Sequence, residues 1–314
     1  MKILVYHNHM KSPILAIILP CYNEEKIINT AYQKLTEILN KLKEKNKISK
    51  NSYISIIDDG STDSSWELIR TFDVKGIKLS RNFGQQKAIL AGLCENEADI
   101  YISIDADLQD DITVVEEMVE KYHEGYEIVY GVRNNRDNDK LSQKVFANIY
   151  YKLNKILGMN TVSQHAEYRL VSKKITDVLK NTNERNIYLI GIITDLGFKS
   201  TKVYYKRQKR LGGKSKYNYY KLMKIAIEGI TSFSTAPIKL IILLGLLGIF
   251  LSIALTLYFL LFKNISMLVI LLVSLYFWGS IQLLSVGLIG MYIGKIYKET
   301  KKRPIYIIEE KNNI

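Results

Sequence analysis

Cysteine is nearly absent from this chain of 314 residues, which contains only Cys21 and Cys94. Two isolated cysteines provide neither a disulfide framework nor the paired spacing of a structural zinc site. We interpret both as small buried hydrophobic residues. A long apolar core is also missing from residues 1–13, which argues against a cleavable signal peptide and leaves this segment, with His7 and His9, as a leader.

Acidic residues are missing from the segment between Phe198 and Lys224, which contains ten Lys or Arg residues. The whole chain has a net charge of +13, which suits nucleic acid, a membrane surface or an anionic substrate. The basic segment directly precedes the apolar C-terminal third, and the anionic lipids of a cytoplasmic leaflet attract such a run. We therefore expect a lipid bilayer, and no nucleic acid, as the partner of this segment.

Charge is missing from two further stretches, Leu240–Phe262 and Asn264–Gly294, which only Lys263 separates. Each exceeds the ~20 residues that span a bilayer, so residues 236–294 are predicted to form a hairpin of two transmembrane helices. Basic residues flank the pair on both sides, which predicts that the domain before it and both termini lie in the cytoplasm of a multi-pass inner (plasma) membrane protein. Residues 216–235 are predicted to form an amphipathic helix in the membrane interface.

The first half of the chain alternates between short apolar runs and helical periodicity. Predicted strands cover residues 14–19, 53–57, 76–80, 99–104 and 127–133, and a strand-like pattern returns at 165–171. This alternation indicates a parallel α/β sheet, so residues 14–215 are predicted to form one α/β domain. The remaining residues 295–314 form a cytoplasmic tail, in which 304–308 are a candidate short strand.

Three of the predicted strands end in polar residues. These ends read Pro20-Cys-Tyr-Asn-Glu24, Asp58-Asp-Gly-Ser-Thr-Asp63 and Asp105-Ala-Asp-Leu-Gln109. Ligands bind beyond the carboxyl ends of strands in open α/β sheets, so the three ends indicate one shared site. The oxygens of the last motif suit Mg²⁺ or Mn²⁺ bound together with substrate phosphates. Asp58 and Asp59 could accept hydrogen bonds from a base or ribose, or could simply cap a turn.

Two further segments carry cations that could contact phosphate. Arg81 follows the third predicted strand, where a plain surface arginine is the alternative. The stretch from Tyr204 to Lys216 combines glycines, a hydroxyl and several cations, which suits a flexible loop closing on phosphate. This loop lacks the residue order of a P-loop.

These motifs, with Arg81-Asn-Phe-Gly84, Glu167-Tyr-Arg-Leu170, Gly213-Lys-Ser-Lys216 and the apolar hairpin, resemble the family 2 glycosyltransferases of GT-A fold. Within that family the chain is similar to the polyprenyl-phosphate glycosyltransferases, which include bactoprenol glucosyltransferases and dolichyl-phosphate mannose synthases. The resemblance covers nearly the whole chain after Lys11. It implies a Rossmann-like, mostly parallel catalytic domain followed by the interface helix and the membrane hairpin.

The resemblance also implies a role for each motif. Asp58 would bind the base, with Pro20, Tyr22 and Glu24 near the nucleoside. The metal and the diphosphate would be held by Asp105, Asp107 and Gln109. The lipid phosphate would be gathered by Arg133, Lys144, Arg210, Ser215 and Lys216. Glu167 takes the place of an Asp proposed as the base in relatives, which makes Asp107, Glu167 and Arg210 the predicted catalytic set.

Three positions depart from the pattern of the family. Gln85 stands where relatives often have Lys, and Ile190 stands where many have Arg before Gly191. Met291 replaces a frequent Glu in the second apolar run. Of these, Ile190 bears most on the predicted contacts with the acceptor phosphate or the sugar.

The expected reaction is transfer of a sugar from a nucleotide sugar to undecaprenyl phosphate, with inversion of the anomeric centre. The Glu167-Tyr-Arg form resembles members that use UDP-glucose or UDP-N-acetylglucosamine, and relatives form homotetramers. Because a phosphate monoester is mostly ionised at neutral pH, with a second pKa near ~6, Glu167 is expected to orient the substrates more than to remove a proton.

Two other functions compete with this prediction. A processive polysaccharide synthase would carry a Gln-x-x-Arg-Trp motif, but Trp66 and Trp278 are the only tryptophans and neither lies in that context. A catalytically silent membrane scaffold, or a partner of a lipid flippase, would leave the acidic strand ends unexplained.

Overall fold

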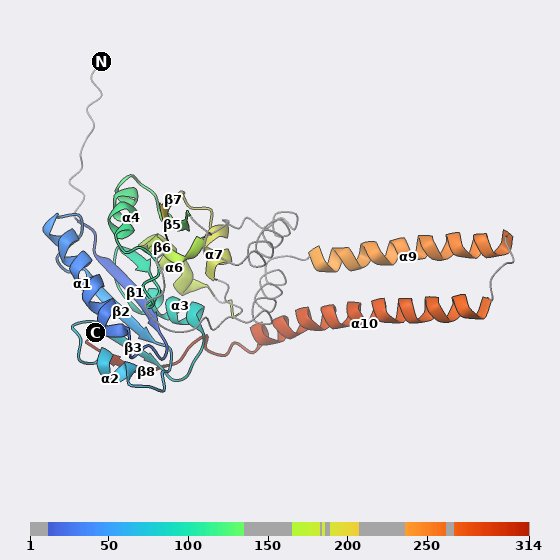
Figure 1. Ribbon diagram of the computed structural model, residues 1–314, viewed down its shortest axis with the longest axis horizontal. Coiled ribbons are helices and arrows are strands. Elements are labelled where there is room, and N and C mark those ends of the chain that lie inside the picture. The colour runs from blue at the N-terminus through green and yellow to red at the C-terminus, as the bar shows by residue number, and fades with distance from the viewer. Residues whose placement is uncertain are drawn as a thin grey trace, which may run out of the picture. The chain divides into compact units, whose positions relative to one another are not determined.

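The computed structural model describes residues 12–134, 165–182, 184–185, 189–206, 236–261 and 267–313. The chain divides into two compact units. The first contains the sheet and the C-terminal tail from Pro304 onward, and the second contains the two long helices that precede this tail (Figure 1).

Within the described residues, eight strands form a single sheet in the order β7-β5-β6-β4-β1-β2-β3-β8. Their bounds are β1 Leu15–Cys21, β2 Tyr53–Asp58, β3 Lys75–Leu79, β4 Ile100–Ser103, β5 Ile128–Arg133, β6 His165–Ser172, β7 Ser200–Tyr205 and β8 Ile308–Asn312. All pairings are parallel except those made by β6 and β8, which run antiparallel to their neighbours. The sheet is therefore the mostly parallel α/β sheet that the sequence predicts.

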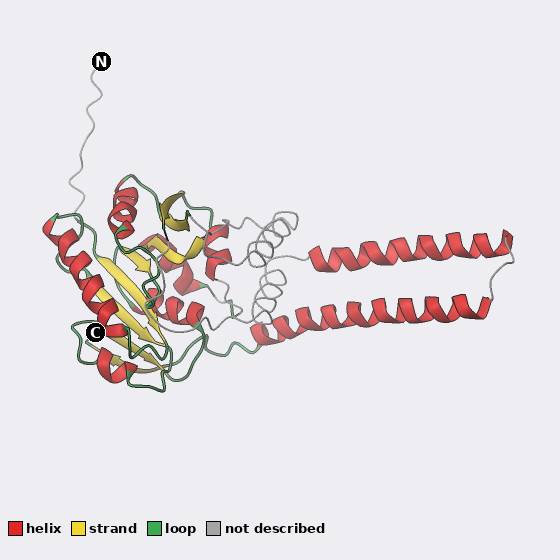
Figure 2. Cartoon of the chain, viewed as in Figure 1, coloured by secondary structure: helices red, strands yellow, loops and turns green. Residues whose placement is uncertain are grey.

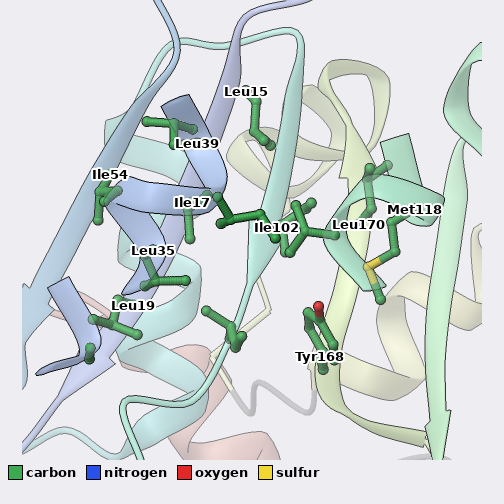
Figure 3. Close-up of a cluster of buried hydrophobic side chains, with 14 of the residues drawn as sticks. Leu15, Ile17, Leu19, Leu35, Leu39, Ile54, Ile102, Met118, Tyr168 and Leu170 are labelled. Carbon is green, nitrogen blue, oxygen red and sulfur yellow. The ribbon is translucent and has the colours of Figure 1, made fainter. Parts of the chain in front are cut away.

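Helices lie on both sides of this sheet (Figure 2). Their bounds are α1 Ile28–Glu44, α2 Ser65–Ile69, α3 Gln85–Glu95, α4 Val114–His123, α6 Lys173–Asn181 and α7 Leu189–Asp195. On one side, Leu15, Ile17 and Leu19 of β1 belong to the same core cluster as the apolar stripe of α1 (Figure 3). On the other, Gly92 brings α3 so close to Ile18 that a Cβ atom would overlap its side chain. Because β1 is covered on both faces, it is apolar throughout instead of alternating.

Five predicted strands are confirmed within one or two residues, and three expectations need correction. The strand β6 is antiparallel and lies between β4 and β5. The strand β7 replaces the start of the predicted loop, because Val203 and Tyr205 are buried while Lys202 and Tyr204 are exposed, a period of two that makes a strand. The tail strand begins at Ile308, where the prediction placed its end.

The second unit contains the helices α9 (Ala236–Leu261) and α10 (Met267–Thr300). Large apolar side chains along both helices are exposed, and Gly248 of α9 packs against the indole of Trp278. Among the described residues, the segment Ile270–Thr300 is the one helix that is long and apolar enough to cross a membrane. The predicted interface helix at 216–235 and most of the leader at 1–13 lie outside the described residues.

Candidate active site

The functional side chains predicted from strand ends gather at one edge of the sheet. The parallel register pairs Cys21 with Asp58 and aligns β4 with β1, so the carboxyl ends of these strands share that edge. Two residues just beyond them adopt left-handed backbone angles, Asn23 at φ 54° and Leu108 at φ 46°. A leucine in this conformation is uncommon and such strain concentrates at functional sites.

The loops after β1 and β2 are bonded to each other. The amide of Asn23 donates to Ser61 Oγ (2.9 Å), and the amide of Thr62 donates to Asn23 Oδ1 (2.8 Å). Asp58 is buried, which raises its pKa, and its carboxylate accepts the amide of Ser61 at 3.2 and 3.3 Å. Tyr22, in contrast, is 37% exposed beside this loop pair. The predicted nucleoside residues Pro20, Tyr22, Glu24 and Asp58 thus belong to one connected structure.

Asp59 performs a backbone role at the same edge. Its two carboxylate oxygens accept the amides of Phe83 (2.7 Å) and Gly84 (2.9 Å), which holds the turn that follows β3. Gly60, at φ 68°, lies so close to the backbone of Arg81 that any Cβ atom would overlap it. Arg81 itself is exposed and stacks over the ring of Phe83 at 4.0 Å.

The acids that follow β4 form an excess of negative charge. Burial, and after it the negative charges of Asp110, Asp107 and Glu167, together raise the pKa of Asp105 to about 7. Two hydrogen bonds order this loop: Gln85 Nε2 donates to Asp105 Oδ1 (2.6 Å), and the amide of Gln109 donates to Asp107 Oδ1 (3.2 Å). The acids would therefore be stabilised by a cation.

This donor set fits a hard divalent cation that shares its ligands with a substrate. No group of three or more His, Cys, Asp or Glu side chains in the described part of the chain is arranged to hold a metal alone. Mg²⁺-type sites commonly use one or two carboxylates and take further ligands from phosphates and water. Asp105 and Asp107 supply such carboxylates, and Gln109 lies on the same loop.

Each carboxylate oxygen of Glu167 has a side-chain partner. Arg169, two residues along β6 and only 2% exposed, pairs with Glu167 Oε2. Gln86 Nε2 donates to Oε1 (3.3 Å), while the other amide atom, Gln86 Oε1, accepts the backbone N–H of Leu189 at the start of α7 (3.0 Å). One side chain of α3 thus connects Glu167 to α7, the helix that also carries Ile190.

A second network surrounds Arg133 at the end of β5. Its Nε donates to the hydroxyl of Tyr205 (3.2 Å), and that hydroxyl donates to Asp110 Oδ1 (2.6 Å). The guanidinium also lies 3.5 Å from the same oxygen of Asp110. The positive charge of Arg133 lowers the pKa of Asp105, against the acids around it, so this network and the acids share one electrostatic environment.

Sequence reasoning missed four residues of these networks: Gln86, Asp110, Arg169 and Tyr205. Asp110 was visible as part of the acidic run, and the period of two over Ser200–Tyr205 could have marked Tyr205 as a strand end. Among the predicted residues, Asp105, Asp107, Glu167 and Arg133 are brought together. The predicted phosphate contacts Lys144, Arg210, Ser215 and Lys216 lie outside the described residues.

Comparison with known proteins assigns this architecture to a family. Residues 16–179 match the family model described as glycosyl transferase family 2. The chain is 43% identical over 308 residues to the uncharacterized glycosyltransferase YkoT of Bacillus subtilis, covering 95% of this chain and 91% of that protein. It is 36% identical to the prophage bactoprenol glucosyl transferase homolog of Escherichia coli, covering 94% and 98%. With the bactoprenol glucosyl transferase of Shigella phage SfX the identity is 34%, covering 95% and 99%.

The mostly parallel sheet with acids beyond its strand ends is the α/β architecture of GT-A type that the sequence resemblance predicts, and the matches show the family. The chain belongs to glycosyl transferase family 2 and is a glycosyltransferase. Its predicted resemblance to the polyprenyl-phosphate members of that family is confirmed by the bactoprenol glucosyl transferase relatives.

Proposed function

We propose that this enzyme transfers a sugar from UDP-glucose or UDP-N-acetylglucosamine to undecaprenyl phosphate at the cytoplasmic face of the membrane. The transfer would depend on Mg²⁺ or Mn²⁺ and would invert the anomeric centre. The observation that carries the proposal is the cluster of Asp105, Asp107 and Glu167 beside Arg133 at the carboxyl edge of the sheet. The printed names of the bactoprenol relatives support a polyprenyl phosphate as acceptor.

The donor would lie across the loops after β1 and β2. Asp58 and Tyr22 would contact the base and nucleoside, and the diphosphate would extend toward Asp105 and Asp107. A divalent cation bound by these two acids would neutralise charge that develops on the leaving diphosphate. Arg81, Asp59 and the turn that Asp59 holds would line the donor side, and Gln109 would complete the metal loop.

The acceptor phosphate would approach from the side of Arg133. Lys144, Arg210, Ser215 and Lys216 are proposed to complete its binding site, with Arg210 also opposing charge in the transition state. Because the phosphate is mostly ionised before it attacks, the chain does not need to supply a strong base. Glu167, held by Arg169 and Gln86, is suited to orienting a substrate in a fixed place.

Membrane attachment would come from the second unit and the basic segment before it. We propose that α9 and α10 form the two membrane spans, that residues 216–235 lie in the interface, and that both termini face the cytoplasm. The domain limits 14–215, 236–294 and 295–314 predicted from sequence are kept, and a homotetramer is proposed from the resemblance.

The test is a transfer assay with the full-length protein in detergent micelles. A panel of radiolabelled nucleotide sugars is offered with undecaprenyl phosphate, and label is measured in butanol-extractable lipid with and without EDTA. We expect lipid labelling from one UDP-sugar, loss of labelling with EDTA, and recovery with Mg²⁺ or Mn²⁺. Asp107→Asn serves as the inactive control.

Other outcomes would point elsewhere. Label in a polymer would indicate a processive synthase, and no transfer with any donor would leave a scaffold role. A lipid product that keeps the anomeric configuration of the donor, as judged by NMR, would exclude single displacement. The processive synthase gains no support from Trp66, whose Nε1 donates to Glu310 of the tail strand at 3.0 Å.

A further inference from the structure

Arg133 is held by two residues from distant parts of the chain. Tyr205 stands opposite it in the parallel register of β5 and β7, and Asp110 follows the metal loop. The three side chains form a continuous series in which Arg133 Nε donates to the Tyr205 hydroxyl and this hydroxyl donates to Asp110 Oδ1. Burial raises the pKa of Tyr205, so the hydroxyl keeps its proton and remains a donor.

Asp110 differs from Asp105 and Asp107, the acids proposed to hold the cation, because its side chain is only 2% exposed. A buried carboxylate is costly unless it is paired and hydrogen-bonded. Here both the arginine and the tyrosine meet the same oxygen, at 3.5 and 2.6 Å. Asp110 is therefore directed toward Arg133 and Tyr205, which gives this acid a different task from the half-buried Asp105 and Asp107.

The restraint matters because of what surrounds Arg133. Its side chain is 28% exposed, and its positive charge lowers the pKa of Asp105. A guanidinium free to rotate would be attracted into the acids that are proposed to hold the cation. The contacts of Nε with Tyr205 and of Nη2 with Asp110 restrain one edge of the guanidinium and keep its other edge in one orientation, which is what recognition of a phosphate requires.

The ring of Tyr205 is placed independently of its hydroxyl. It packs edge-on against Tyr168 with a centroid distance of 5.5 Å, and the residue is buried. Tyr205 is also the last residue of β7, five residues before Arg210 in the basic segment. Replacing it by Phe therefore removes two hydrogen bonds while leaving the packing of the strand end intact.

We infer that Tyr205 and Asp110 are positioning residues that hold Arg133 for the phosphate monoester of the acceptor lipid. This inference rests on the proposed function. Arg133 would touch the phosphate, whereas Tyr205 and Asp110 would act only through Arg133. The donor diphosphate carries the same chemical group, so an experiment has to separate the two phosphate sources.

The experiment measures binding and turnover of the full-length protein and of four variants. The variants are Tyr205→Phe, Arg133→Ala, their combination, and Tyr101→Phe as a control. Tyr101, in β4, is matched to Tyr205 because it is buried and its hydroxyl also makes two hydrogen bonds. The hydroxyl donates to Asn96 O (3.0 Å) and accepts the amide of Ala98 (2.9 Å), two residues that precede β4. Farnesyl phosphate and UDP are the two probes, titrated separately by calorimetry, and melting temperatures are recorded.

We expect Tyr205→Phe to weaken farnesyl phosphate binding about tenfold, the range for a lost hydrogen bond to a charged group. UDP binding should change less than about twofold, and Tyr101→Phe should leave both affinities unchanged. In the Arg133→Ala background, Tyr205→Phe should have almost no further effect, because residues that act through one another are not additive. The KM for the acceptor should rise in Tyr205→Phe while the KM for the donor is kept.

Equal farnesyl phosphate affinity in Tyr205→Phe and the unaltered protein would overturn the inference, as would full additivity with Arg133→Ala. If Tyr205→Phe lost affinity for UDP and not for farnesyl phosphate, Arg133 would belong to the donor site, and this result too would overturn the inference. An enzyme that binds farnesyl phosphate but transfers no sugar would contradict the proposed function alone, because the binding arm still decides the role of Tyr205. Failure of the unaltered protein to bind farnesyl phosphate would overturn the inference.

Discussion

Glu167 shows how the surroundings of one carboxylate decide what it can do. A general base needs a free oxygen and a pKa suited to taking a proton. Here one oxygen meets the buried guanidinium of Arg169 and the other accepts from Gln86. Both partners restrain the position of the carboxylate. The geometry therefore suits orientation of the sugar or the acceptor better than proton transfer.

The substitution Glu167→Gln tests this role. We expect kcat to fall less than about 100-fold, below the 10²–10⁴ range of a lost general base, with the acidic limb of the pH–rate profile unchanged. Thermal melting must be measured alongside, because Arg169 would lose its buried partner. Asp107→Asn, in the proposed metal pair, should be affected far more. Complete loss of turnover with donor and metal binding intact would instead make Glu167 the base.

The acids of the site could be predicted individually from the sequence, whereas the residues that position the functional side chains could not. Asp58, Asp105 and Asp107 each follow an apolar strand, and parallel strands bring such ends together. Gln86 and Leu189, in contrast, are bonded across 103 residues, and Tyr205 and Asp110 across 95. No local pattern marks such pairs, because they depend on the antiparallel insertion of β6 and on β7. Both strands depart from the simple alternation on which the prediction rested.

The tail strand β8 completes the sheet from the other end of the chain. It pairs antiparallel with β3 through four residue pairs, from Gly76 with Asn312 to Leu79 with Ile308. Side chains reinforce the pairing: Glu310 accepts from the indole of Trp66, and Lys311 meets Glu95 at 3.1 Å. The tail therefore covers an edge that would otherwise expose a row of unpaired backbone groups.

Truncation after Ile307 should destabilise the sheet. Cross-strand pairs contribute roughly 0.2–1 kcal/mol each, so loss of four predicts about 1–4 kcal/mol and a clearly lower melting temperature. The matched control is Glu309→Gln, because the exposed pair of Glu309 with Lys78 is worth less than about 1 kcal/mol. A truncated protein that melts like the intact one would mean that β8 does not stabilise this edge.

The helix α4 is tied to the segment after α1 by charge. Glu116 contacts Lys45 (2.5 Å) and Lys47 (2.7 Å), and these cations lower its pKa from 4.5 to about 2. A carboxylate whose pKa is lower in the folded state stabilises the fold above its unfolded value. That contribution is present above about pH 4.5 and is lost as the pH falls toward 2.

Glu116→Gln should remove this pH-dependent contribution. At neutral pH we expect the variant to be less stable by about 0.5–1 kcal/mol, as for other largely solvated ion pairs. On acidification the two stabilities should converge, as followed by thermal melting in detergent at a series of pH values. Glu124→Gln, which removes the exposed pair with Lys121 one turn away, is the control. A constant difference between Glu116→Gln and the unaltered protein down to acid pH would contradict the assignment.

The strand pairing also constrains how the whole chain can cross a membrane. The strand β3 precedes α9 and α10, and β8 follows them, yet both lie in one sheet. If the helical unit is inserted in a bilayer as proposed, its two ends must then lie on the same side. If α10 crosses as proposed, the chain has to cross an even number of times, and α9 is the proposed second span. At 26 residues, α9 is about 39 Å long, which is enough for that proposed role across a ~30 Å hydrocarbon core.

If α9 and α10 both span the membrane, epitope tags placed between them and after them should be accessible from opposite sides of the membrane. A tag inserted next to Lys263 should be reached by antibody from outside, whereas a tag after Ile314 should be reached only after permeabilisation. The protein should also stay in the membrane pellet after washing at about 1 M salt. At that ionic strength the Debye length is only ~3 Å, so electrostatic attraction to the membrane surface is screened. Release by salt would mean that the basic segment alone attaches the protein. A tag at Lys263 that is reached only after permeabilisation would mean that α9 and α10 lie on the membrane without spanning it.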